Sequence, residues 1–441
     1  MKIGFISLGC AKNRVDTEIM MGLLKNDGHS IVNDTAQAEA VVINTCGFIE
    51  SAKTEAIQTI LDTARFKELN LLKHLIVTGC LSQRYALQLA QEMPEIDGML
   101  GISSFMRITE TVRRVMSGER VVEICPPAAH YIEQGPRILT TPAGTAYLKI
   151  AEGCGNRCSY CAIPAIRGGL RSRPLQDIVE EASRLTAEQK VRELVLVAQD
   201  LTSYGNELDD PKTDLYYLLE ELQMLPGDFW IRLLYAYPGR ISPQLTDLIA
   251  GSAKIVPYLD IPIQHASDQV LRRMNRRGDR EQLLEMLDVL RRKIKNLVLR
   301  STVMVGFPGE TEDDYLTLLD FIRQAQFDWL GAFAYSPEES TPAAAYDMQV
   351  EDEIKAERLD GVMREQSAVT REKNISRIGS REKILVSSRL SAQLYIGRGY
   401  YQAPEVDGVT LVKSKHSLNK GDFIETVIEG VRGYDLIGRE I

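Results

Sequence analysis

The sequence predicts an α/β protein made of three domains. Apolar runs alternate with helical patterns through residues 1–125, which predicts an open, mostly parallel sheet covered by helices. From residue 146 the same alternation resumes with a longer repeat, and its six strand–helix units predict an incomplete (β/α)6 barrel of the TIM type. Short strand patterns punctuated by glycine then predict a small antiparallel β-barrel of the OB-like kind. We place the domains at residues 1–125, 136–374 and 375–441.

The composition indicates a globular protein from a reducing compartment. Of its 441 residues 44% are hydrophobic and 26% charged, which is ordinary for a globular chain. Its seven cysteines are odd in number and mostly scattered, which argues against a disulfide framework. The N-terminus does not resemble a signal peptide, and no apolar run approaches the roughly 18 residues of a membrane span. We therefore expect a cytoplasmic protein with no membrane partner.

The charge is unevenly distributed along the chain. The net charge is −9. Basic and acidic residues number 13 and 16 in residues 1–135, 29 and 37 in 136–374, and 10 and 8 in 375–441. An acidic central domain repels phosphate and attracts a basic partner.

Three cysteines of the first domain occupy equivalent positions. Cys10, Cys46 and Cys80 each follow an expected strand and precede an expected helix. The expected strands are 2–8, 40–44, 75–78, 98–101 and 120–124, and the helices are 15–26, 49–68, 83–93 and 105–117. Because ligands bind at the carboxyl ends of parallel strands, the three thiols could meet at one site. The pattern alone favours the other interpretation, that cysteine simply packs well at strand ends.

Three further cysteines form a CxxxCxxC motif after a prolyl linker near residues 125–145. Cys154, Cys158 and Cys161 lie close enough in the sequence to face one inorganic centre. Three thiolates leave one iron of an iron–sulfur cluster open to another ligand. A structural zinc site has similar spacings, but no His or further Cys lies between Cys161 and His265 to complete it. The spacing therefore favours a cluster over zinc.

The motif follows the first expected strand of the barrel, where the active site of such barrels lies. The expected strands are 146–151, 193–198, 230–235, 258–263, 297–305 and 329–335, with helices at 174–189, 215–225, 243–251, 280–293 and 311–324. Polar or glycine-rich segments follow other strands, including Gln199-Asp200, His265 and Gly306 to Gly309. A lone His at such a place is as often scaffolding as catalytic. A charged helix is expected over 351–373, and short strands at 382–387, 393–397, 409–413, 422–430 and 435–440.

The motifs together resemble those of the methylthiotransferase family of radical S-adenosylmethionine (SAM) enzymes. Tyr160 before the last Cys completes the likeness of Cys154–Cys161 to the radical SAM signature. The segments Leu8-Gly9-Cys10-Ala11-Lys12-Asn13, Asn44-Thr45-Cys46 and Thr78-Gly79-Cys80 resemble the family's N-terminal motifs, and the C-terminal part resembles its TRAM domain. The resemblance implies two [4Fe–4S] clusters, an auxiliary one on Cys10, Cys46 and Cys80 and a SAM-binding one on Cys154, Cys158 and Cys161. It thus reverses the interpretation of the first three thiols as packing residues.

Within the family, the sequence resembles the branch that modifies an aspartate of ribosomal protein S-twelve. The pointers are Cys10-Ala11-Lys12-Asn13-Arg14, Gln264-His265-Ala266-Ser267 and Met274-Asn275-Arg276-Arg277. This resemblance implies SAM used both as methyl donor and as radical source, an external electron donor, and S-twelve or the small ribosomal subunit as partner. The barrel's excess of eight acidic residues suits a basic protein. The alternatives are methylthiolation of a tRNA adenosine, and a zinc-stabilised RNA-binding protein without catalysis.

Contacts with SAM are expected from the strand ends. By position we assign them to Tyr160, Gln199, Asp200, Arg300, Gly306 and Gly309. The two glycines allow the backbone to approach a flat adenine or a charged group.

Overall fold

The computed structural model describes residues 1–132, 134–210 and 212–441. These residues form two compact units. The first unit contains residues 1–140, 151–172 and 336–344, and the second contains 141–150, 173–335 and 345–441. The domain limits expected at 125, 136 and 374 stay a prediction.

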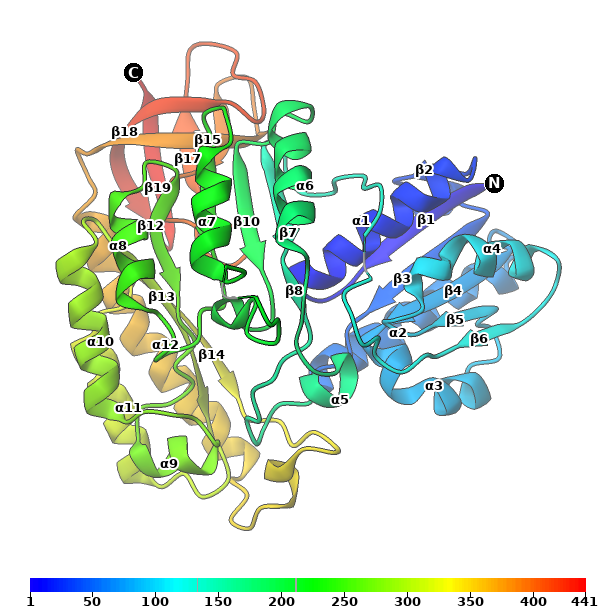
Figure 1. Cartoon of the computed structure of the whole chain (residues 1–441), viewed down its shortest axis with the longest axis horizontal. Helices are drawn as coiled ribbons and strands as arrows, with labels where there is room; N and C mark the ends of the chain where they lie inside the picture. Colours follow the sequence, from blue (N-terminus) through cyan, green and yellow to red (C-terminus); the bar gives the residue numbers. More distant parts are fainter. Residues whose placement is uncertain (133, 211) are drawn as a thin grey trace. The chain divides into compact units, whose positions relative to one another are not determined.

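The first unit is built on a six-stranded parallel sheet with the order β2-β1-β3-β4-β5-β6 (Figure 1). The strands are β1 (Lys2–Ser7), β2 (Ser30–Val32), β3 (Ala40–Thr45), β4 (His74–Gly79), β5 (Gly98–Leu100) and β6 (Val121–Glu123). The helices are α1 (Ala11–Asn26), α2 (Glu50–Glu68), α3 (Cys80–Glu92) and α4 (Ile108–Met116), with 3-10 turns η1 (Thr35–Gln37) and η2 (Phe105–Arg107). The predicted open parallel sheet is therefore confirmed. The short edge strand β2 is the one strand of this sheet that the sequence pattern missed.

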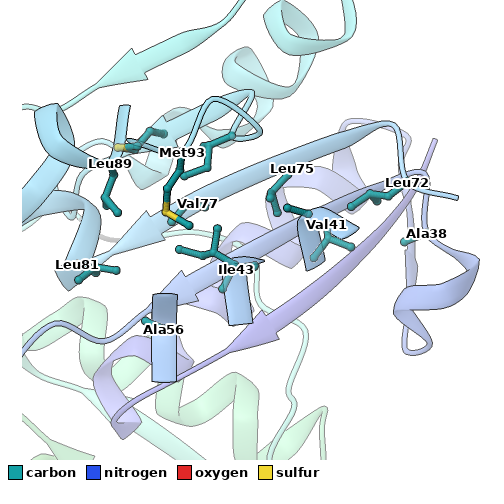
Figure 2. Close-up of a cluster of buried hydrophobic side chains, with 14 residues drawn as sticks. Ala38, Val41, Ile43, Ala56, Leu72, Leu75, Val77, Leu81, Leu89 and Met93 are labelled. Carbon is teal, nitrogen blue, oxygen red and sulfur yellow. The ribbon is translucent and has the colours of Figure 1, made fainter. Parts of the chain in front are cut away.

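A continuous apolar core holds this sheet and its helices together. Every residue of β3 is buried, as expected for a central parallel strand. Figure 2 shows apolar side chains of β3, β4 and the helices gathered into one cluster. Its buried members are Ala38, Val41, Ile43, Ala56, Ile60, Ala64, Leu72, Leu75, Val77, Leu81, Leu89, Met93, Ile96 and Met99. Burial of these side chains fixes β3 and β4, and therefore also the loops that follow them.

Two segments from later in the sequence complete the first unit. One carries the short antiparallel pair β8 (Ala151–Glu152) and β9 (Arg171–Ser172) and the helix α5 (Ile163–Arg167). In the other, residues 336–344, the buried carboxylate of Glu338 accepts from Arg84 at 2.9 Å and from Lys53 at 3.2 Å. The backbone N–H of Ala343 donates to the carbonyl of Ser159 at 2.9 Å. These bonds fasten residues 336–344 to α2, α3 and the CxxxCxxC loop.

The second unit contains a six-stranded parallel sheet with the order β14-β13-β12-β11-β10-β7. The strands are β7 (Thr145–Lys149), β10 (Glu193–Val197), β11 (Trp230–Leu233), β12 (Ile255–Asp260), β13 (Val298–Val305) and β14 (Trp329–Ala334). The helices are α6 (Leu175–Ala187), α7 (Leu215–Met224), α8 (Pro243–Gly251), α9 (Asp268–Arg273), α10 (Arg280–Lys293), α11 (Glu312–Ala325) and α12 (Asp352–Ile375), with 3-10 turns η3 (Leu201–Ser203) and η4 (Pro342–Ala345, shared with the first unit). The incomplete six-stranded barrel is confirmed, and the short helix α9 is additional. No helix in the described ranges is both long and apolar enough to cross a membrane.

The C-terminal strands close into a small barrel with the order β15-β16-β17-β19-β18. They are β15 (Arg381–Arg389), β16 (Leu394–Arg398), β17 (Thr410–Lys413), β18 (Phe423–Arg432) and β19 (Asp435–Glu440). Four neighbouring pairs are antiparallel, as expected, whereas β17 and β19 pair in parallel. The parallel pair closes the barrel, and strand alternation in a sequence does not reveal such a closure.

Buried charges join this small barrel to the amino ends of the parallel strands. Glu193, the first residue of β10, is fully buried and pairs with Arg232 at 2.7 Å and with Arg398 of β16. Burial by itself would raise the pKa of Glu193, but the charges of Arg398 and Arg232 outweigh it and lower that pKa to about 2. Trp329 also donates to the carbonyl of Tyr401 at 2.7 Å.

A second buried carboxylate lies in the loop between β16 and β17. Asp407 accepts from the hydroxyl of Tyr258 at 2.7 Å and from the N–H of Ala403 at 2.8 Å, and it lies 3.4 Å from Arg300. Arg300 pairs more closely with Asp260, at 2.9 Å. Burial raises the pKa of Asp407 to about 6, although Arg300 opposes the rise.

Glu193→Gln should lower the free energy of unfolding by about 3–5 kcal/mol, because it leaves two buried guanidinium groups without their carboxylate. Glu365→Gln is the matched control, since Glu365 pairs at 2.7 Å with the half-exposed Arg323. An exposed pair contributes less than about 1 kcal/mol. Urea denaturation of both variants measures the difference, and equal losses would contradict the role assigned to Glu193.

Asp407→Asn should change how stability depends on pH. The unfolded carboxyl titrates near 3.8 and the folded one near 6, so the folded state binds the proton more tightly. The stability contributed by Asp407 is complete below pH 3.8 and is lost as the pH rises through 6. The melting temperature of the variant minus that of the wild type should therefore increase from about pH 5 to about pH 7. A constant difference would show that Asp407 does not titrate there.

Candidate active site

The sheet of the first unit brings Cys10, Cys46 and Cys80, hereafter the N-terminal triad, to one edge. Thr45 of β3 pairs in register with Gly79 of β4, so Cys46 and Cys80 leave the sheet side by side. A Cβ atom built on Gly9, next to Cys10, would lie 3.3 Å from the sulfur of Cys46. The three thiols therefore lie close together, whereas the sequence pattern alone favoured the interpretation that they only pack at strand ends.

Glycines beside the triad permit this close approach. Gly9 and Gly79 have φ angles of +92° and +103°, which residues with side chains rarely adopt. A Cβ on Gly79 would lie 2.3 Å from the carbonyl oxygen of Thr45, and one on Gly47 would lie 2.7 Å from the backbone of Leu81. Side chains at these positions would push the three loops apart.

The three thiols have different acidities. Cys10 is exposed, yet the protein atoms around it would by themselves raise the pKa of its thiol. The charges of Lys12 and Arg167 outweigh this effect, so the pKa of Cys10 is lowered overall. Burial raises the pKa of Cys46, and it raises that of Cys80 to about 11 despite Arg167. Cys80 is therefore the thiol most in need of a positive charge before it can act as a thiolate ligand.

Cys154, Cys158 and Cys161, hereafter the motif triad, lie on a loop held by its own backbone. The N–H of Cys154 donates to the carbonyl of Gly168 at 3.2 Å, and that of Cys161 donates to the carbonyl of Cys158 at 3.1 Å. A Cβ on Gly153 would lie 2.0 Å from the carbonyl oxygen of Gly169, so this close pairing requires glycine. All three cysteines are partly exposed, which leaves the loop open to a ligand.

Both triads suit an iron–sulfur cluster. All seven cysteines are described, and none forms a disulfide. Within the described ranges, no three His, Cys, Asp or Glu side chains lie close enough together to bind one metal ion directly. Iron–sulfur clusters take Cys thiolates as ligands, so two sets of three thiols fit two clusters, each with one iron left open.

The other residues assigned to SAM lie on the second unit, apart from Tyr160. Asp200 is buried and accepts from Thr202 and Ser203, each at 2.7 Å, and pairs with Arg240; Gln199 precedes it directly. Arg300 lies near the start of β13 and pairs with Asp260 and Asp407. The structure thus engages Asp200 and Arg300 in contacts within the protein, and their contact with SAM stays a prediction.

The two glycines of the fifth strand end adopt the backbone conformation that only glycine tolerates well. Gly306 and Gly309 have φ angles of +70° and +82°. A Cβ on Gly306 would lie 2.2 Å from Lys355, and one on Gly309 would lie 2.6 Å from Arg273. Their proposed approach to adenosine, like the role of Tyr160, stays a prediction.

His265 has contacts that favour scaffolding over catalysis. Its side chain is fully buried, and Nδ1 accepts from the N–H of Ser267 at 3.0 Å. Its Nε2 lies 3.5 Å from Glu310, which pairs with Arg358 at 2.8 Å. These bonds connect the turn after β12 with the turn after β13.

Sequence reasoning assigned no role to four residues that the structure makes prominent. Tyr235 follows β11 with a φ angle of +65°, and Gln264 follows β12 with a φ angle of +72°. Residues with such strained backbone are often found at functional sites. Asn13 lies three residues after Cys10 and Arg167 six residues after Cys161, and a hydrogen bond joins these two side chains across 154 residues of sequence. Backbone strain and long-range contacts leave no periodic signal in a sequence.

Comparison with known proteins defines the class. Residues 2–101 match the family described as Uncharacterized protein family UPF0004, residues 148–322 match the Radical SAM superfamily, and residues 378–441 match the TRAM domain. With the six-stranded barrel and the CxxxCxxC loop, these matches define a radical SAM enzyme. The interpretation as a zinc-stabilised RNA-binding protein without catalysis is thereby set aside.

The chain belongs to the RimO family of ribosomal protein uS12 methylthiotransferases, uS12 being the S-twelve protein. It is 53% identical over 438 residues to Ribosomal protein uS12 methylthiotransferase RimO of Syntrophomonas wolfei, with 99% of each chain covered. The same protein of Pelotomaculum thermopropionicum is 46% identical, with 100% of this chain and 99% of the relative covered. That of Clostridioides difficile is 44% identical, with 99% and 98% covered. The enzyme thus uses SAM and two [4Fe–4S] clusters, as its family does.

Solved structures share the fold at low sequence identity. The radical SAM methyltransferase TsrM of Kitasatospora setae, solved with cobalamin and a [4Fe–4S] cluster, gives a TM-score of 0.56 at 15% identity, covering 78% of this chain and 76% of TsrM. The cobalamin-dependent SAM radical enzyme OxsB gives 0.56 at 11% identity, covering 82% of this chain and 56% of OxsB.

Anaerobic reconstitution should give about eight irons per chain, four on each triad. Replacing Cys154, Cys158 and Cys161 by Ala should remove about half of the iron. Cys125 lies in the prolyl linker, outside both triads, so Cys125→Ala is the matched control and should keep all of it. Four irons in the wild type would mean that the N-terminal triad holds no cluster.

Proposed function

We propose that the enzyme replaces a hydrogen on the β-carbon of an aspartate of ribosomal protein uS12 by a methylthio group. The observation that carries the proposal is the presence of two separate cysteine triads in one compact unit. Abstracting an unactivated hydrogen and delivering sulfur are different tasks, and side chains supply neither, so each needs its own inorganic centre. The full-length relatives named as uS12 methylthiotransferases support the choice of substrate.

Each triad has one assigned task. The motif triad would hold the cluster at which SAM binds, and the N-terminal triad would hold the auxiliary cluster that carries the sulfur. When bound, the clusters and SAM supply the electron transfer, the radical and the methyl group. The chain's own part is to hold the two centres in fixed positions, to align the substrate and to exclude water.

The charge distribution supports a protein substrate over tRNA. Residues 136–374 carry eight more acidic than basic residues, whereas a tRNA-binding surface must neutralise several phosphates. We therefore place the basic protein uS12, alone or in the small ribosomal subunit, as the partner, together with an external electron donor. A ribosomal substrate also places the enzyme in the cytoplasm.

The test is mass spectrometry of uS12 after incubation with reconstituted enzyme, SAM and reductant. One aspartate should gain about 46 daltons, because –SCH₃ replaces –H. Cys10→Ala should abolish this product while SAM cleavage continues, since the motif triad is intact. Methylthio-adenosine in tRNA, with uS12 left unmodified, would instead favour the tRNA alternative.

A further inference from the structure

Arg167, the last residue of α5, carries a buried positive charge to the N-terminal triad. Its side chain is 1% exposed. It pairs with Glu152 at 2.7 Å, and Asp16 lies 3.6 Å away. Its Nη2 donates to the sulfur of Cys80 at 3.5 Å and to Oδ1 of Asn13. A residue of α5, the helix that follows the motif triad, thus contacts a cysteine of the N-terminal triad directly.

Asn13 determines where this guanidinium points. Its Nδ2 donates to the carbonyl of Thr45 at 2.9 Å and to that of Leu8 at 3.2 Å, the residues just before Cys46 and Gly9-Cys10. The backbone carbonyl of Asn13 accepts from the side-chain amide of Asn44 at 2.8 Å. Both hydrogens of the Asn13 side-chain amide are therefore used. Its oxygen, Oδ1, can only accept, and it accepts from Arg167 and, at 3.9 Å, from the thiol of Cys80.

An apolar cluster lies beside these polar contacts. Cys80, Ile102, Ala162 and Ile166 form a buried apolar cluster, so α5 presses against the start of α3. Apolar surroundings have a low dielectric constant, so the attraction between a cation and a nearby thiolate is stronger there than in water. The guanidinium of Arg167 and the apolar side chains of this cluster thus both lie beside Cys80.

We propose that Arg167 is a positioning residue, aimed by Asn13 and held by Glu152, whose positive charge beside Cys80 raises the reduction potential of the auxiliary cluster. This inference rests on the proposed function, because it assumes a cluster on the N-terminal triad. A positive charge beside a cluster favours the more negative, reduced form. Arg167 and the motif triad lie in the same segment, residues 151–172. This segment would therefore set the reduction potential of the auxiliary cluster on the N-terminal triad.

The test is a redox titration of the reconstituted full-length enzyme followed by EPR. The titration is made with Cys154, Cys158 and Cys161 replaced by Ala in every variant, so that the auxiliary cluster gives the one remaining signal. Arg167→Gln should lower the ratio of reduced to oxidised auxiliary cluster at least tenfold at a fixed potential, about 59 mV for one electron. Arg167→Lys keeps the charge and should recover most of that ratio. Asn13→Ala should shift it in the same direction as Arg167→Gln.

Arg173→Gln is the matched control, because Arg173 is also buried and pairs with Glu181 but belongs to the second unit. Its auxiliary potential should equal that of the wild type. If Arg167→Gln holds less iron than Arg167→Lys, the requirement for charge is supported. Wild-type potentials in both variants at full iron content, or equal loss of iron from both, would overturn the inference. Four irons in the wild-type chain would instead refute the proposed function itself.

Discussion

The ion pair between Glu152 and Arg167 is the interaction on which the arrangement of the two cysteine triads depends. Both side chains are almost completely buried, so each charge would be costly without the other. The pair fixes the guanidinium on α5 while its other nitrogen reaches Asn13 and Cys80. Because Asn13 also binds the loops before Cys10 and Cys46, one ion pair ties the SAM motif to all three strand ends of the N-terminal sheet.

The rest of the first unit supports this arrangement from other directions. Parallel pairing of β3 and β4 places Cys46 and Cys80 side by side, and the apolar core fixes those strands. Glu338 binds Lys53 and Arg84, and Ala343 binds the loop of the motif triad at Ser159. Segments from three parts of the sequence therefore hold the six cysteines. These noncovalent contacts hold the two triads in fixed positions, which a reaction at two centres requires.

Periodicity predicted the three architectures, and spacing favoured a cluster on the motif triad, because strands, helices and ligand spacing are local properties of a sequence. The pattern alone favoured packing roles for Cys10, Cys46 and Cys80, and only the resemblance to the methylthiotransferase family assigned them to a cluster. Edge elements were missed: β2 and β8 are too short to leave a pattern. Long-range polar contacts were also missed. Arg300 was assigned to SAM by its position, yet its carboxylate partners include Asp407, which lies in the C-terminal barrel 107 residues further along the chain. No periodic signal indicates which buried acid a given arginine will meet.

The most direct test of the central claim, that one compact unit holds both cluster-binding triads, is the EPR spectrum of the fully reduced, reconstituted enzyme. Because α5 packs on α3 and Arg167 contacts Cys80, the two reduced clusters should be close enough for their spins to couple. The coupling should vanish, leaving one simple signal, when Cys154, Cys158 and Cys161 are replaced by Ala. Two independent, uncoupled signals in the wild-type enzyme would contradict the claim.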